Sequence, residues 1–196
     1  MAAGTLDRVH PYLAAARERV LVYDGATGTN LQLVDLGPDD FGGPALEGCN
    51  EVLVRTRPDV IRRLHESFLE VGVDVIETDS FGSLAPVLAE YDLADETYEL
   101  NVTSATLARE VASGFATADR PRFVAGSVGP GTKLPTLGHI PYAELRDAYE
   151  VMAQGLLAGG VDLFLVETVQ DLLQAKAVYL ELRSDGAEEV VGGDAA

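Results

Sequence analysis

Short apolar runs alternate with longer segments of helical periodicity along most of this chain, and this alternation constrains the fold more than any other feature. Each apolar run is followed by polar residues or glycine, which is typical of a buried strand in a parallel sheet. The segments between them repeat apolar residues every three or four positions, as amphipathic helices do. We therefore predict parallel strands at residues 20–23, 73–77, 123–127 and 161–166, with helices at 58–71, 95–112, 141–159 and 171–183.

Two of the predicted strands lie within segments of the same layout. Residues 70–78 (EVGVDVIET) and 159–168 (GGVDLFLVET) each contain a helix end, a glycine, an aspartate, a strand and a closing Glu-Thr pair. Repeated βα units favour a (β/α)₈ TIM barrel over a doubly wound sheet. The common nucleotide-binding motifs, G-x-G-x-x-G after the first strand and G-x-x-x-x-G-K-[ST] anywhere, do not occur.

The length limits how much of a barrel the chain can build. A complete barrel takes about 250 residues, and this chain has 196. We therefore expect a truncated or split domain, a half barrel of the first four βα units over residues 18–183. We expect residues 1–17 to form an N-terminal extension or helix, and residues 184–196 an acidic, glycine-rich tail with no further strand–helix unit. Because a half barrel leaves open sheet edges, we also expect self-association.

Charge and composition exclude several classes of partner. The formal net charge is −18, which disfavours binding to nucleic acid. No apolar run reaches the roughly 20 residues of a membrane span, and the N-terminus lacks the apolar block of a signal peptide, so we expect a cytoplasmic protein without membrane contact. Cys49 is the only cysteine, so neither an internal disulfide nor a thiolate metal cluster can be built from this chain alone. We interpret Cys49 as a structural loop residue.

The residues that follow the four predicted strands carry the chemistry. The first strand runs into DGATGT at residues 24–29 and the second ends in ETDSFG at 77–82, while SVGPG at 127–131 and ETVQD at 167–171 follow the others. In a parallel barrel these ends share one face. Glycine turns can direct backbone amides at an anion, and a carboxylate can hold an ammonium group, so the set predicts a site for an α-amino acid. Taken singly, Asp24 could be a turn or cap residue, and Glu167 could form a salt bridge at the barrel rim.

In these same segments the chain resembles the homocysteine S-methyltransferase family. DGATGT at residues 24–29 is similar to the opening motif of the family, LEGCNE at 46–51 with RPD at 57–59 to a second landmark, and ETDSFG at 77–82 to E-T-N-T-F-G. GSVGPGTKLPTLGH at 126–139 and VET at 166–168 are close to the form in cobalamin-dependent methionine synthases. The resemblance covers residues 18–183 in the right order and spacing.

The resemblance implies methyl transfer to the sulfur of homocysteine, giving methionine. Users of folate-linked cobalamin, S-methylmethionine and betaine share the opening motifs, and the segment at residues 129–139 favours methylcobalamin as the methyl donor in the full-length protein. The resemblance also implies a zinc ion held by three cysteines that this chain lacks, so we expect the isolated chain to be inactive. The expected partners are homocysteine and the remainder of the barrel or the cobalamin and folate domains. The substrate-binding residues that the resemblance implies are Asp24 and Glu167 for the ammonium group, the backbone of Gly25, Ala26, Thr27, Gly28 and Thr29 for the carboxylate, and Asp79, which replaces an asparagine of the family.

Two alternatives remain open at this point. One is a non-catalytic half barrel that binds a ligand or dimerises. The other is a barrel enzyme of another class, although a Schiff-base aldolase would need a lysine at a strand end. Lys133 lies in a predicted loop and Lys176 in a predicted helix. His139 is interpreted as an exposed loop residue and His65 as a surface or packing residue.

Overall fold

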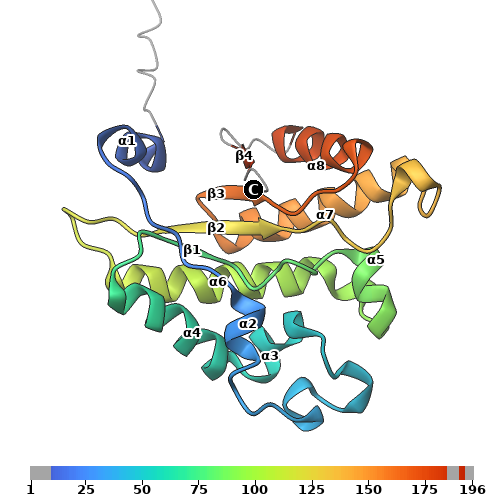
Figure 1. Ribbon diagram of the computed structural model, residues 1–196, viewed down its shortest axis with the longest axis horizontal. Helices are drawn as coiled ribbons and strands as arrows, with labels where there is room; N and C mark the ends of the chain where they lie inside the picture. Colours follow the sequence, from blue (N-terminus) through green and yellow to red (C-terminus); the bar gives the residue numbers. More distant parts are fainter. Residues whose placement is uncertain (1–9, 185–189, 193–196) are drawn as a thin grey trace, which may run out of the picture.

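Four parallel strands form the centre of the molecule (Figure 1). The computed structural model describes residues 10–184 and 190–192. Strands β1 (Val75–Glu77), β2 (Phe123–Val128), β3 (Leu163–Val166) and β4 (Val190–Gly192) lie side by side in chain order. This arrangement confirms the α/β class with a parallel sheet.

The helices agree closely with the sequence prediction. Helix α4 has the predicted bounds, with Pro58 in its first turn and Gly72 at its C-cap in the left-handed conformation that glycine adopts without strain. Asp171 accepts hydrogen bonds from the Leu173 and Gln174 amides, at 2.7 and 3.3 Å, and so caps α8 as expected.

The helices are α1 (Pro11–Glu18), α2 (Thr27–Leu31), α3 (Leu53–Thr56), α4 (Pro58–Val71), α5 (Ala85–Leu88), α6 (Thr97–Phe115), α7 (Tyr142–Gly159) and α8 (Leu172–Ser184). Short 3₁₀ turns are η1 (Pro38–Phe41), η2 (Pro44–Leu46), η3 (Asn50–Val52), η4 (Ala89–Tyr91), η5 (Ala94–Glu96) and η6 (Pro135–Leu137).

The expected strand at residues 20–23 is wrong in extent. Only Tyr23 forms a β-bridge, to Val75, although the Val22 carbonyl also accepts hydrogen bonds from the Asp74 and Val75 amides. The side chains of Val20 and Val22 are 85% and 52% exposed. The apolar run therefore lies along the edge of β1 rather than inside the sheet. The apolar pattern predicted a longer strand than the structure contains.

The expected tail contains a strand that the sequence analysis did not predict. Residues 190–192 form β4, in which Val190 pairs with Phe164 and Val191 with Leu165 of β3. Two successive β-branched residues suit a strand, and the edge of β3 offers them free backbone partners. The rest of the predicted tail and residues 1–9 lie outside the described residues.

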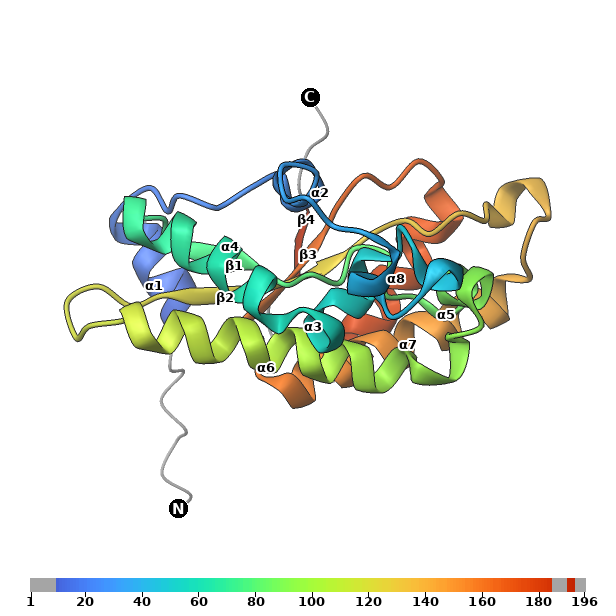
Figure 2. The same cartoon turned by 90° about the horizontal axis from the view of Figure 1, so that it is seen from below.

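Helices α4, α6, α7 and α8 pack against one another in chain order, and α6 and α7 lie along one face of the sheet (Figure 2). The core on this side includes Phe164 of β3 with Tyr149, Met152 and Leu156 of α7. Helices α6 and α7 approach closely because α7 carries glycine at the contact. A Cβ on Gly159 would lie 2.5 Å from the Cβ of Ala105.

Alternate strand residues form a second cluster on the sheet. Val75, Phe123, Ala125 and Leu163 pack together with Tyr12 of α1, whose ring meets that of Phe123 edge-on at a centroid distance of 5.5 Å. A helix therefore lies within the predicted N-terminal region, and it covers part of this cluster. None of the helices in the described ranges is both long and apolar enough to cross a lipid bilayer.

Candidate functional site

A cavity of about 220 Å³ lies where the carboxyl ends of β1, β2 and β3 meet the start of α2. The predicted strand ends therefore do converge on one place. Five of the eight sequence-predicted residues are among its lining residues, and Asp24, Gly25 and Thr29 are not. The cavity is lined by Ala26, Thr27, Gly28, Asn50, Glu51, Glu77, Thr78, Asp79, Phe81, Ser127 and Glu167.

Asp24 is fixed directly beside this cavity by the backbone of β1. Its amide donates to the Val75 carbonyl at 3.0 Å, and its two carboxylate oxygens accept from the Glu77 amide at 3.0 and 3.1 Å. Burial raises the pKa of Asp24 to about 7; the amides of Glu77 and of Asp24 itself oppose that rise, and the charge of Glu167 adds to it. Asp24 and Glu167 are therefore at the same end of the sheet and close enough to interact.

Glu167 reaches the cavity from the end of β3. Its amide donates to the Val128 carbonyl at 3.2 Å, and its Oε1 accepts from Ser127 Oγ at 2.7 Å. The next residue, Thr168, has a φ of +59°, so the chain turns away sharply after Glu167. The hydroxyl of Ser127 thus orients the carboxylate, and within the described residues this hydrogen bond occupies only one of its two oxygens.

Glu77 is a member of this cluster that the sequence analysis did not select. Burial, followed by the charges of Asp24 and Glu167, raises the pKa of Glu77 to about 8. The signal for Glu77 was present in the repeated layout, because the Glu-Thr pair that closes residues 70–78 corresponds to the pair at 167–168. Both glutamates close a strand and both line the cavity.

The glycine-bearing turn contributes backbone rather than side chains. Ala26 has a φ of +51°, the left-handed conformation, and begins the short helix α2. Asn30 secures this turn by donating from its side-chain amide to the Ala26 carbonyl at 3.0 Å. The backbone from Ala26 to Gly28 is thereby held against the cavity.

Glu51 and Asn50 enter the site from the loop that precedes α3, and the sequence analysis missed both. Glu51 Oε1 accepts from the Gly82 amide at 2.8 Å, and a Cβ on Gly82 would lie only 2.5 Å from that oxygen. Glycine at 82 therefore leaves room for Glu51 in this position, which a larger residue would displace. In the sequence, both residues lie within LEGCNE at 46–51, a segment that resembles the family. The resemblance did not assign a role to either residue.

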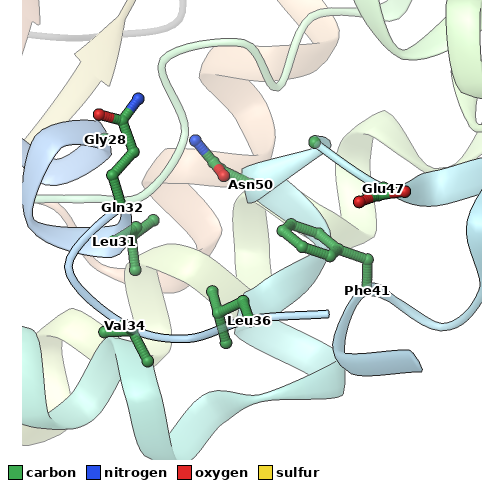
Figure 3. Close-up of a pocket in the computed structure, with 9 residues that line it drawn as sticks. Gly28, Leu31, Gln32, Val34, Leu36, Phe41, Glu47 and Asn50 are labelled. Carbon is green, nitrogen blue, oxygen red and sulfur yellow. The ribbon is translucent and has the colours of Figure 1, made fainter. Parts of the chain in front are cut away.

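A second cavity of about 400 Å³ adjoins the first, since Gly28 and Asn50 line both (Figure 3). Leu31, Val34, Leu36 and Phe41 form an apolar part of its wall, and the polar side chains of Gln32, Glu47 and Asn50, with Gly28 and Gly48, complete the lining. It extends the site toward the surface between α2 and the 3₁₀ turns.

The side chains around the first cavity offer mainly carboxylate and hydroxyl oxygens, with no thiolate, and therefore suit an ammonium group better than a thiolate zinc site. Cys49 is buried, its thiol donates to Glu51 at 3.6 Å, and burial together with the charge of Glu51 raises the pKa of this thiol to about 12. Within the described residues no three side chains of histidine, cysteine or acid type are grouped to hold a metal ion. The residues present therefore do not fit the zinc site that the resemblance implies.

His65 and His139 are not among the residues that line these two cavities. His139 is an exposed loop residue whose Nδ1 accepts from the Leu134 amide at 3.4 Å. His65 is a packing residue of α4, 1% exposed, and its burial lowers the pKa of the imidazole to about 4. Both agree with the interpretation of the sequence.

Replacing Glu77 by glutamine is expected to stabilise the fold at pH 8 by on the order of 1–2 kcal/mol, and to have little effect at pH 4. The pKa of Glu77 is raised from 4.5 to about 8. The unfolded chain ionises this group above pH 4.5, whereas the folded chain keeps the proton, so stability is lost as the pH rises through this window. Urea unfolding at both pH values measures the effect. A Glu77→Gln variant that is less stable at pH 8 contradicts this account, and Glu144→Gln on the surface of α7 is the control.

Comparison with known proteins identifies the class. The family model for homocysteine S-methyltransferases matches residues 21–191, so the chain belongs to the homocysteine S-methyltransferase family. It is 53% identical over 166 residues to a methionine synthase of Mycobacterium tuberculosis and 51% identical over 171 residues to one of Mycobacterium leprae. These matches cover 85% and 87% of this chain but 14% of each relative.

Solved structures show the same fold. The homocysteine methyltransferase MmuM of Escherichia coli matches with a TM-score of 0.75 in its metallated form and 0.76 in its oxidized form, at 21% and 20% identity. The matches cover 92% and 93% of this chain and 65% of MmuM. The chain therefore has the fold of about two thirds of that enzyme.

Proposed function

We propose that this chain is the homocysteine-binding part of a methyltransferase of the methionine synthase type. The family membership and the identity of 53% to a methionine synthase support this proposal. In the same proposal residues 18–183 are the first part of a (β/α)₈ barrel, with 1–17 and 184–196 as flanking segments. The proposal includes a cytoplasmic location, which rests only on the sequence features described above.

One observation carries the binding role. Asp24, Glu77 and Glu167 come from neighbouring strand ends and interact electrostatically at one cavity, and no basic side chain is among its lining residues in the described part of the chain. Carboxylates that are crowded and partly buried in this way favour a bound cation. The ammonium group of an amino acid supplies that charge and donates three hydrogen bonds, while the backbone from Ala26 to Gly28 is available to its carboxylate.

The chemistry of the whole reaction needs more than this chain provides. The sulfur of homocysteine is nucleophilic as the thiolate, and no described residue near the cavity favours that form. We propose that zinc-binding cysteines come from a region outside this sequence, and that methylcobalamin carried by further domains donates the methyl group. The single buried Cys49 favours, as a second candidate for the chain alone, a module that binds the ligand without turnover.

Isothermal titration with L-methionine and L-homocysteine tests the proposal. We expect both to bind, and 4-(methylthio)butanoic acid, which is methionine without its amino group, to bind at least about tenfold more weakly because it cannot satisfy the acidic cluster. The same preparation, given methylcobalamin and homocysteine, is expected to form negligible methionine. Equal affinity for the ligands with and without the amino group would overturn the binding role, and methionine formation would overturn the binding-only role of the isolated chain.

A further inference from the structure

Asp79 is a buried acid whose charge nothing in the described chain compensates. It follows β1, is 6% exposed and lines the cavity together with Glu51 and Phe81. Its Oδ2 is buried without a hydrogen-bond partner, and none of the salt bridges among the described residues includes it. A carboxylate in such surroundings would lose its hydration without replacement, which is far more costly than burying the neutral acid.

The groups around Asp79 act in the same direction. Glu51 faces it from the loop before α3, and Glu77 and Glu167 line the same cavity from the ends of β1 and β3. All three are acids. Glu51 is the better placed of the Glu51–Asp79 pair to carry a negative charge, because its oxygens accept from the Gly82 amide and the Cys49 thiol. Burial, followed by the charge of Glu51, raises the pKa of Asp79 well above its usual value.

We propose that Asp79 is a neutral carboxylic acid in the folded protein and donates a hydrogen bond from its O–H group to the carboxylate of the bound amino acid. This assignment rests on the proposed function for the identity of the ligand. An ionised Asp79 would repel the ligand carboxylate, whereas the protonated form supplies one donor, as does the asparagine of the similar family motif. The acidic residue at position 79 therefore preserves a donor and adds no charge.

The protonation state is tested without any ligand. Difference infrared spectra of the chain and its Asp79→Asn variant are compared at pH 9, where Glu77 and Asp24 have lost most of their protons. We expect a carbonyl-stretch band of a protonated carboxyl group in the unmodified chain that the variant lacks. Circular dichroism at the same pH verifies that both are folded. Absence of the band, or its persistence in the variant, overturns the proposal.

The donor role is tested by titration with L-methionine at pH 7. Asp79→Asn retains a donor and is expected to bind within about threefold of the unmodified chain. Asp79→Leu keeps a similar volume without a donor, so it is expected to remain folded and to bind about tenfold or more weakly. Equal binding by the leucine variant overturns the donor role. If the infrared band is present and no form binds methionine, the neutral state of Asp79 stands while the proposed function and the donor role fail.

Discussion

Replacing Glu167 by glutamine is expected to weaken the binding of L-methionine by about 10- to 100-fold. Hydrogen bonds to charged groups contribute about 1.5–3 kcal/mol, and each 1.4 kcal/mol is a factor of ten in affinity. The glutamine has the shape of the glutamate, and its carbonyl oxygen can still accept the hydrogen bond from Ser127, which Glu167 accepts at 2.7 Å. The change therefore removes the negative charge at the end of β3 with little disturbance of the strand.

The measurement is isothermal titration at pH 7.5 with matched controls. Glu144→Gln makes the same chemical change at an exposed position on α7 and is expected to leave the affinity unchanged. Asp24→Asn, on the opposite side of the cluster, is expected to weaken binding in the same range. An affinity of the Glu167 variant within twofold of the unmodified chain would remove Glu167 from the amino-acid site.

The sequence predicts the part of this fold that depends on local pattern. Helix α4 has its proline, its apolar stripe and its terminal glycine within one segment, and its bounds are correct. The segment at residues 20–23 failed because an apolar run predicts burial, and whether both faces are covered is decided by distant residues. β4 was not predicted, for the converse reason. Its two valines stand among acidic and small residues, and only pairing with β3 makes a strand of them.

The sequence also predicts that Asp24 and Glu167 lie at the same end of the sheet, while their role in binding stays a proposal. Asp24 and Glu167 follow strand regions directly, and parallel topology brings such residues together, so the pair could be selected from sequence. Glu51 could not, because its place depends on how the loop before α3 folds back onto Gly82. The neutral state that we propose for Asp79 also depends on three-dimensional surroundings. Its burial and the nearby charge of Glu51 have no signature in the letters ETDSFG.

Replacing Asp74 by alanine is expected to destabilise the fold by about 3–5 kcal/mol, which is the cost typical of breaking a buried ion pair. The Asp74 side chain is 2% exposed and contacts three guanidinium groups, those of Arg19 at 2.7 Å, Arg122 at 3.3 Å and Arg120 at 3.6 Å. It also accepts from the Val22 amide at 3.0 Å. Most of the loss is expected from Arg122, which is 7% exposed and would keep its charge without this carboxylate. Arg19 and Arg120 are 40% and 50% exposed and are expected to contribute little.

This cluster also connects stability to the site. Asp74 accepts a hydrogen bond from the Val22 amide, and Asp24 of the acidic cluster lies two residues further along the chain. Loss of the Asp74 carboxylate is therefore expected to weaken the attachment of this segment to β1 and, with it, the position of Asp24. Urea unfolding measures the change in free energy, with Asp74→Asn as a milder variant should the alanine form not fold. Asp147→Ala, which breaks an exposed ion pair with Arg146, is the control and is expected to cost less than about 1 kcal/mol.

The pH dependence distinguishes an ion pair from mere packing. Burial raises the pKa of Asp74, but the hydrogen bonds from Arg19 and Val22 and the charges of Arg19 and Arg120 outweigh it, so the net direction is downward. A carboxyl group with a lowered pKa stabilises the fold above its unfolded pKa and loses that contribution as the pH falls through the folded one. The difference between Asp74 and Asp74→Asn should therefore shrink on acidification. A constant difference from pH 7 down to the acid transition would mean that the shape of Asp74, and not its charge, holds the first segment against β1.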